Sequence, residues 1–416
     1  MREIDKYSFG IGDRFSHQGR AQLEALVNAT TELGLNITPV WNKSNREHNI
    51  VHSVPADTRA EADDAVKALS YTGPYFVDAD HINLTTVDRY IEHCDFFTLD
   101  VADYIGKKAP QPEIDAFVEK HRAICGHLSI PAIDNRFEIT ELYLRNFAEK
   151  FLFAVNEASN IYKHIESKKG AGNFVTEVSM DEVDEPQKPL DMLFILKTLA
   201  DLKVPVQTIA PKFTGRFNKG VDYEGDPVQF GKEFEEDILV IDYAVKSFGL
   251  PENLKLSVHS GSDKFSIYPV MGSIIKKYDK GIHVKTAGTT WLEEITGLAL
   301  SGGRGLEIAK TIYRRAFERK EELCAPYATV IDIKSDKLPV PSVVDNYSGE
   351  QFAAALQHEQ LDPAYNPSFR QLLHVGYKIA SELNKDYTDA LVANRKIIAR
   401  CVTGNLYDRH ILRLFR

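Results

Sequence analysis

The segment VDADHIN places an aspartate and a histidine side by side, Asp80 and His81, at the end of an apolar run. Where a strand passes into a loop, two adjacent side chains can reach one pocket. A neutral imidazole nitrogen can bind a divalent metal there, while the neighbouring carboxylate moves protons. The structural alternative is a surface or core histidine beside an aspartate that caps a helix.

A second histidine, His259, ends the apolar run of LSVHSGSDKF and precedes the small residues Ser260, Gly261 and Ser262. Small residues let a ligand approach the backbone closely, and the N-terminus of a following helix offers N–H donors to an anion. Ser262 or Asp263 could equally serve as a simple helix cap.

The third candidate is Glu177, which lies within the apolar pattern of FVTEVSM. A carboxylate among such neighbours is costly to bury unless it has a partner or a function. We therefore predict that Glu177 is catalytic. We expect the acids that follow it to form a solvated loop: Asp181, Glu182, Asp184 and Glu185.

The segment TIAPKFTGRFNKGVDYEGD combines cations with acids. The cations suited to a substrate carboxylate are Lys212, Arg216 and Lys219. The acids that could supply an oxygen ligand to a metal are Asp222, Glu224 and Asp226, and spacing alone does not choose among them. The segment HVKTAGTTWLEE adds two polar residues at another strand end, His283 and Lys285.

These side chains need a framework that gathers the ends of several strands. Short apolar stretches rich in β-branched and aromatic residues alternate with longer segments of helical periodicity. The expected strands begin at Tyr7, Leu35, Pro74, Asp95, Phe174, Val206, Leu254 and Ile282. Eight such βα units predict a closed (β/α)₈ TIM barrel, whose active site forms at the C-terminal ends of the strands.

Two regions add to this plan. An irregular segment over 129–137 precedes a long helix expected over 140–166, and the chain beyond Thr290 is predicted to be largely helical. We expect residues 1–290 to form the barrel and residues 291–416 to pack on it as a helical extension of one integrated domain. That extension would cover the barrel mouth or form the interface of a homo-oligomer.

Composition excludes several classes of function. The chain has 416 residues, 43% of them hydrophobic, and a formal net charge of −10, which argues against binding nucleic acid over a basic surface. Its four cysteines form no C-x-x-C pair, and no apolar run approaches the roughly 18–20 residues that span a bilayer. We expect a cytoplasmic protein without membrane contact. GIGDRF lacks the third glycine of a dinucleotide fingerprint, so NAD is not expected.

Five blocks resemble the tagaturonate/fructuronate epimerase family of bacterial hexuronate catabolism: KFTGRFNKGVDYEGD, LSVHSGSDKFSIYP, GIHVKTAGTTWLEE, YNPSFRQLLHVGYKIA and VTGNLYDRHI. The resemblance spans nearly the whole chain. It implies a metal-dependent barrel enzyme that interconverts D-tagaturonate and D-fructuronate. A shorter likeness relates Asp80, His81 and His259 to the proton-transfer aspartate and metal histidines of class II sugar-phosphate aldolases.

The implied reaction inverts the carbon β to a ketone, whose C–H is not acidified by that carbonyl. Retro-aldol cleavage between the α and β carbons instead leaves an enediolate that a divalent cation can stabilise. Rotation of the aldehyde before re-addition then inverts the centre. One carboxylate must take the β-hydroxyl proton, and another must return it.

The resemblance implies a role for each candidate. Asp80 and Glu177 are the acid/base pair, and His81, His259 and Asp226 bind one divalent cation, which could be zinc, manganese, cobalt or nickel. Lys212, Arg216 and Lys219 bind the carboxylate of the keto sugar acid. The reserve candidates are Asp222, Glu224, His283 and Lys285.

Two other functions stay open at this point. A metal-dependent aldolase would have an open barrel mouth and release three-carbon products, whereas an epimerase must retain the aldehyde under a closing segment. A non-catalytic sugar-acid-binding protein would show no turnover after metal addition.

Overall fold

The computed structural model describes residues 2–260, 262–286 and 288–416. Within these ranges a closed barrel of eight parallel strands forms in the order β1-β10-β9-β8-β7-β4-β3-β2. The strands are β1 (Tyr7–Ile11), β2 (Ile37–Ser44), β3 (Phe76–Ile82), β4 (Phe96–Asp100), β7 (Val175–Ser179), β8 (Thr208–Ala210), β9 (Lys255–His259) and β10 (Ile282–Lys285). All eight expected strands are present, and the predicted (β/α)₈ barrel is confirmed. Gly261, one of the small residues after His259, lies outside the described residues.

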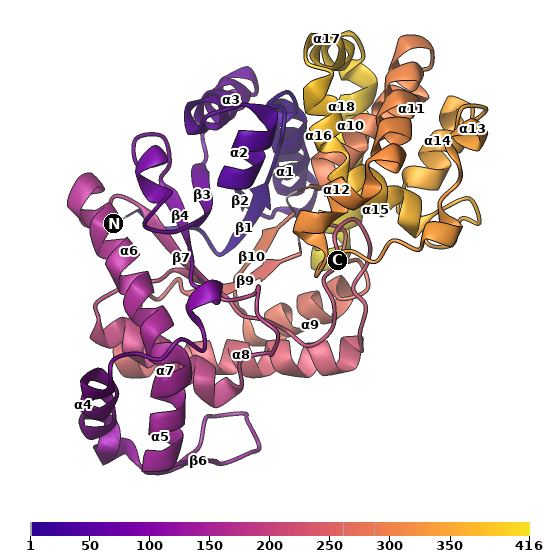
Figure 1. Ribbon diagram of the computed structural model, residues 1–416. Helices are drawn as coiled ribbons and strands as arrows, with labels where there is room; N and C mark the ends of the chain where they lie inside the picture. Colours follow the sequence, from indigo (N-terminus) through magenta and orange to yellow (C-terminus); the bar gives the residue numbers. More distant parts are fainter. Residues whose placement is uncertain (1, 261, 287) are drawn as a thin grey trace.

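Helices surround the barrel (Figure 1). The longer ones are α1 (Gly19–Leu33), α3 (Pro55–Ala68), α6 (Phe153–Lys169), α7 (Pro189–Asp201), α8 (Pro227–Phe248) and α9 (Tyr268–Tyr278), and the short ones beside β2, β3 and β4 are α2 (Asn45–Val51), η1 (Val87–Arg89) and η2 (Ala102–Tyr104). Local signals set the ends of α8: Asp226 caps its start, Pro227 takes the first position, and Gly249, with φ of +68°, ends it.

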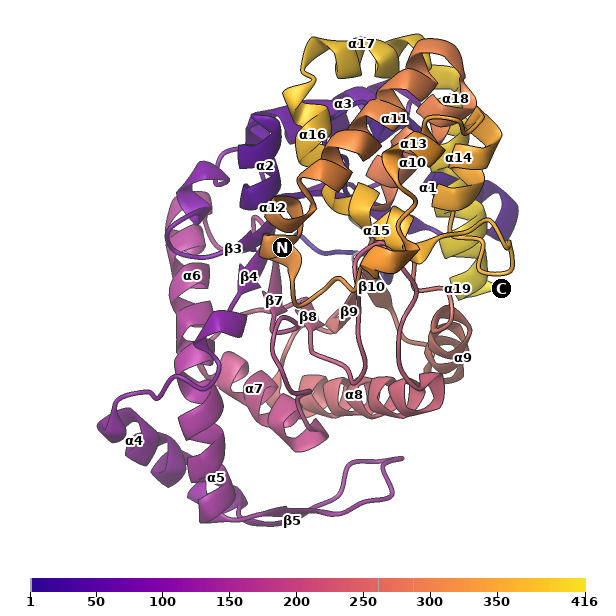
Figure 2. The ribbon, with the colours of Figure 1, turned by 45° about the vertical axis from the view of Figure 1, so that its right-hand side comes forward.

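An excursion separates β4 from β7. It comprises α4 (Gln111–His121), η3 (Arg122–Ile124), the antiparallel pair β5 (Gly126–Leu128) and β6 (Phe137–Ile139), and α5 (Glu141–Phe147). A π-helical turn over Ala148–Leu152 joins α5 to α6, so the expected long helix is present with an irregular turn inside it. Figure 2 shows the hairpin reaching away from the barrel.

The chain beyond β10 is helical. Its elements are α10 (Thr289–Leu300), α11 (Gly303–Glu318), α12 (Lys320–Cys324), η5 (Ala325–Tyr327), η6 (Ser335–Lys337), α13 (Pro341–Val344), α14 (Gly349–Leu356), α15 (Pro367–Val375), α16 (Tyr377–Glu382), α17 (Lys385–Ala393), α18 (Arg395–Gly404), η7 (Asn405–Ile411) and α19 (Leu412–Phe415). Most of them share a hydrophobic core of their own, whereas Ile411, Leu414 and Phe415 join the core of the barrel. The helices after β10 are therefore attached to the barrel at both ends of their run.

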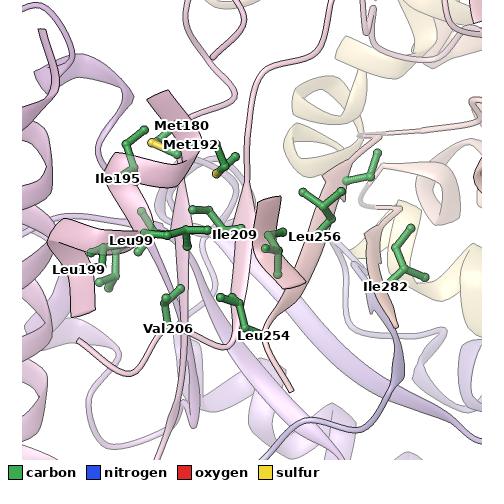
Figure 3. Close-up of a cluster of buried hydrophobic side chains, with 14 of the residues drawn as sticks. Leu99, Met180, Met192, Ile195, Leu199, Val206, Ile209, Leu254, Leu256 and Ile282 are labelled. Atoms are coloured by element: carbon green, nitrogen blue, oxygen red, sulfur yellow. The ribbon is translucent and has the colours of Figure 1, made fainter. Parts of the chain in front are cut away.

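Apolar side chains on the outer face of the barrel pack against the helices, as Figure 3 shows for Leu99 and Ile209 with Ile195 and Leu199 of α7. The inner face of the barrel carries apolar side chains at one end and polar side chains further along the strands. Its apolar floor is the buried cluster of Ile4, Val40, Phe76, Phe96 and Val175.

Because side chains alternate along a strand, the residues two positions further along the same strands also point into the barrel. These residues are Asn42, Asp78, Thr98 and Glu177, all buried. The barrel interior thus changes from apolar to polar toward the C-terminal ends of its strands. Among the described helices, none is long and apolar enough to cross a membrane.

Candidate metal and acid/base site

An irregularity at the end of β3 brings Asp80 and His81 to the same side. The pairing of β3 with β4 shifts register between Ala79 and Ile82, and His81 has a φ of +52°, in the left-handed region that non-glycine residues seldom occupy. Nδ1 of His81 consequently lies 2.8 Å from Oδ1 of Asp80. The side chains of the two neighbours are therefore in direct contact.

His81 and His259 approach each other across the barrel mouth with Asp181 between them. One ligand atom from each of the three residues lies within 4.8 Å of the other two. Oδ1 of Asp181 is 3.1 Å from Nδ1 of His259 and 3.8 Å from Nε2 of His81, and the two rings are 5.1 Å apart between centroids.

This donor set fits a divalent metal ion. Nε2 of His81 is buried and has no hydrogen-bond partner among the residues that the structure describes. A buried nitrogen left unpaired is costly, and here it lies beside a carboxylate and a second imidazole. Two imidazoles and one carboxylate are ligands that zinc and other first-row divalent ions accept.

The structure corrects the expected third ligand. Asp226 is exposed, and its Oδ1 accepts a hydrogen bond from the backbone N–H of Val228 at 2.9 Å, which caps α8. Asp181, which we expected in a solvated loop, takes the place near the histidines instead. Asp181 lies two residues beyond the end of β7, so strand alternation does not fix its direction, and only the path of the loop brings it to the histidines.

The other two acids considered for that position are also engaged elsewhere. Asp222 accepts hydrogen bonds from the backbone N–H of Ser266 at 3.1 Å and from Nε2 of Gln360 at 2.9 Å. Glu224 accepts one from Nδ2 of Asn218 at 3.1 Å. Both acids therefore brace loops in this structure.

Glu177 and Asp80, the proposed acid/base pair, lie on either side of a buried ammonium. Nζ of Lys285 is 2.9 Å from Oδ1 of Asp80 and 2.9 Å from Oε1 of Glu177, and it is 2.8 Å from Oδ2 of Asp78. Oε1 of Glu177 also lies 2.9 Å from Nε2 of His259. Glu177 thus connects the lysine to the metal-binding candidates. Lys285 was only a reserve candidate, because a lysine at a strand end gives no local sign of reaching acids on other strands.

Carboxylates outnumber basic groups in this cluster. Burial alone would raise the pKa of Glu177 and of Asp181, but nearby cations hold both pKa values well below the usual range. Burial also raises the pKa of Asp78, to about 7. Without a metal ion, Lys285 and protonation of the two histidines offset the charge of these carboxylates, so a divalent cation that displaces the imidazole protons would take over part of that compensation.

The three cations proposed for a substrate carboxylate have different surroundings. Lys212 is half-buried, and its backbone N–H donates to Oε1 of Gln187 at 2.8 Å. Arg216 is exposed, and its guanidinium lies 4.0 Å from Glu224. The backbone N–H of Lys219 donates to the carbonyl of Val330 at 2.7 Å, which places this lysine against the C-terminal helices.

His283, another reserve candidate, lies lower in the barrel. Its Nδ1 is 2.8 Å from Oγ of Ser8, and its ring packs on Phe96 of the apolar floor with centroids 5.4 Å apart. Burial lowers the pKa of His283 to about 3. This histidine is therefore a neutral part of the interior in this structure.

The C-terminal helices contact the loops that follow several strands. Arg370 of α15 donates to the carbonyl of Gly220 at 2.6 Å and to Oδ2 of Asp263 at 2.7 Å. Nη1 of Arg14, just after β1, donates to the carbonyl of His374 at 3.1 Å. The extension therefore lies at the C-terminal face of the barrel, where the site is.

A family model described as tagaturonate epimerase matches residues 1–399. The chain belongs to this family. A curated tagaturonate/fructuronate epimerase of Thermotoga maritima is 28% identical over 384 residues, which are 89% of this chain and 72% of that protein. The family resemblance of the sequence is confirmed, and the protein is an epimerase, an enzyme of the isomerase class.

Solved structures of a family member agree with the fold. The fructuronate-tagaturonate epimerase UxaE of Cohnella laeviribosi, complexed with one glycerol, is 23% identical with a TM-score of 0.80, covering 99% of this chain and 82% of that one. Its native crystal structure is 22% identical with a TM-score of 0.78, covering 100% of this chain and 82% of that one.

Proposed function

We propose that the protein interconverts D-tagaturonate and D-fructuronate with the help of a divalent metal ion, by retro-aldol cleavage and re-addition. One observation carries the proposal: Asp80 and Glu177 are held beside the cluster of His81, Asp181 and His259, so that two proton-transfer groups adjoin the residues that would hold a metal ion. The chain's membership of the tagaturonate epimerase family supplies the substrate.

His81, Asp181 and His259 would hold the metal ion, whose identity among zinc, manganese, cobalt and nickel the ligands leave open. When bound, such an ion supplies Lewis acidity to the substrate ketone and so favours cleavage of the adjoining carbon–carbon bond. Asp80 orients the ring of His81 from the opposite nitrogen, as carboxylates commonly do for histidine ligands.

The carboxylates of Asp80 and Glu177 would carry out the proton transfers. One of them takes the proton of the β-hydroxyl as the bond between the α and β carbons opens. After the aldehyde has rotated, the other carboxyl group, which must enter the reaction protonated, donates its proton to the new hydroxyl on the opposite side, and proton exchange with solvent then restores both protonation states. Asp80 and Glu177 suit this exchange because they extend from different strands, β3 and β7, and both are buried.

Cationic side chains and the C-terminal helices would keep the substrate in place. Lys219 lies in a loop held by the C-terminal helices, so it can meet the uronate carboxylate beneath them, with Lys212 and Arg216 as further cations of the same loop. Helices at the barrel mouth would retain the aldehyde between cleavage and re-addition. This retention distinguishes an epimerase from an aldolase.

The test is to incubate metal-reconstituted protein with tagaturonate in deuterated water and to follow fructuronate by NMR. We expect fructuronate without deuterium at the inverted carbon, because the retro-aldol route breaks no C–H bond there. Deuterium at that carbon would reject the mechanism but not the activity. Absence of fructuronate with zinc, manganese, cobalt and nickel would reject the function, and free three-carbon products would indicate an aldolase.

A further inference from the structure

Lys285 extends from β10 into the interior of the barrel and meets residues of three other strands. Its Nζ contacts Asp78 and Asp80 of β3 and Glu177 of β7 at 2.8–2.9 Å. It also lies 2.5 Å from Oγ1 of Thr98 on β4. Neither β3, β4 nor β7 pairs with β10 in the barrel order, so only a long side chain that crosses the interior can make these contacts.

We propose that Lys285 is a positioning residue of the epimerisation, which holds Asp80 and Glu177 by one oxygen each and leaves the other oxygen of each for the substrate. The proposal rests on the proposed function, because it assigns those two carboxylates to proton transfer.

The carboxylate oxygens of Glu177 and Asp80 that do not contact Lys285 support this arrangement. Oε1 of Glu177 lies 2.9 Å from both Nζ of Lys285 and Nε2 of His259 and 3.2 Å from Oγ1 of Thr98, whereas Oε2 is buried and has no hydrogen-bond partner in the described part of the chain. Oδ1 of Asp80 receives Lys285 and His81, whereas Oδ2 has a long contact of 3.5 Å with Nδ2 of Asn42. A buried carboxylate oxygen without a donor is costly, and a substrate hydroxyl would satisfy it.

The barrel makes room for this lysine at Gly10. Gly10 of β1 is the register partner of Lys285, and a Cβ atom at that position would lie 2.8 Å from Cγ and 3.2 Å from Cα of Lys285. Any larger residue must therefore push the lysine stem aside. Glycine at this position is explained by the path of the lysine, because its own φ is not in the left-handed region.

Asp78 and Thr98 also hold the ammonium of Lys285 in place. Oγ1 of Thr98 donates to Asp78 at 2.9 Å, and Oδ2 of Asp78 forms an ion pair with Nζ of Lys285 at 2.8 Å. Burial alone would lower the pKa of Lys285, but the charges of Asp78, Asp80 and Glu177 raise it well above the usual value. The lysine is thus a fixed cation that donates a hydrogen bond to Asp80 and forms an ion pair with Glu177.

A second buried lysine provides a matched control. Lys255 also points into the barrel, but from the N-terminal end of β9, and its Nζ donates to the backbone carbonyls of Ile4 at 3.3 Å and Asp5 at 2.6 Å. Both lysines are at most 4% exposed. Removing either side chain takes a buried amino group from the barrel, but only Lys285 contacts the proposed acid/base pair.

The experiment compares Lys285→Met with Lys255→Met in the metal-loaded enzyme. For Lys285→Met we expect kcat to fall about 100-fold, with KM for tagaturonate within about threefold of the wild type and unchanged metal content, because the lysine is neither a ligand nor a substrate contact. Lys255→Met should lower thermal stability and leave kcat within about threefold. Methylammonium should restore part of the kcat of Lys285→Ala but not that of Glu177→Gln.

Gly10→Ala gives an independent test if Lys285→Met does not fold. It keeps the charge of the lysine but displaces its stem, so kcat should again fall while KM and metal content hold. The proposal is overturned if Lys285→Met or Gly10→Ala retains kcat within about threefold, or if KM rises as much as kcat falls. Epimerisation by the wild-type protein decides the proposed function separately, since these comparisons are ratios to wild type.

Discussion

Nδ1 of His81 lies 2.8 Å from Oδ1 of Asp80, although the two residues are neighbours in the chain. On a regular strand, adjacent side chains point to opposite faces. The left-handed φ of His81 removes that restriction. With Nδ1 engaged, Nε2 is left to face Asp181, so one backbone irregularity joins a proton-transfer candidate to a metal-ligand candidate.

The first prediction concerns the third ligand. Asp181→Asn should weaken binding of zinc by roughly 100-fold or more, because an amide oxygen is a much poorer ligand than a carboxylate. Asp226→Asn is the control, since asparagine caps helices about as well as aspartate and Asp226 lies outside the cluster. Equilibrium dialysis measures both. Loss of zinc from Asp226→Asn alone would restore Asp226 as the ligand.

Glu177→Gln should lower kcat by roughly 10²–10⁴-fold, the usual contribution of a general acid or base. The amide keeps the size of the side chain but cannot take a proton. Glu185→Gln removes an exposed acid from the loop that follows the same strand, and it should leave kcat unchanged. Steady-state kinetics with tagaturonate compare the two, and equal activities would exclude Glu177 from proton transfer.

Metal binding should depend on pH. Burial alone would lower the pKa of His81 and of His259, but the nearby carboxylates raise both above the usual value. Below these pKa values each imidazole is protonated, and the metal must displace that proton. Zinc affinity should therefore fall as pH drops, by about tenfold per unit for each proton displaced. Calorimetry between about pH 6 and pH 8 measures it, and a constant affinity would contradict the assignment.

Arg370 should contribute strongly to stability. Its guanidinium and the carboxylate of Asp263 are fully buried and paired at 2.7 Å. Arg370→Met leaves that carboxylate without its main partner, which should cost about 3–5 kcal/mol in the free energy of unfolding. Arg304→Met, which breaks an exposed pair with Asp386, should have little effect. Denaturant unfolding compares the two, and equal losses would refute the argument.

Much of the fold could be predicted because its signals are local. Apolar runs with β-branched residues marked each barrel strand, and polar residues at their ends marked the face that carries the site. Asp80, His81, Glu177 and His259 were selected as candidates in this way. The π-helical turn inside the expected long helix escaped prediction, since it differs from an α-helix only in the spacing of backbone hydrogen bonds.

The sequence alone determined the barrel, the polar strand ends and the family, since each depends on residue types at short spacing. Only the tertiary structure decided that Asp181 joins the histidines while Asp226 caps α8, because loop paths set which carboxylate reaches a pocket. It also decided the role of Lys285. Contacts across a barrel join strands that lie far apart in the chain, so no local pattern records which acids a long side chain will meet.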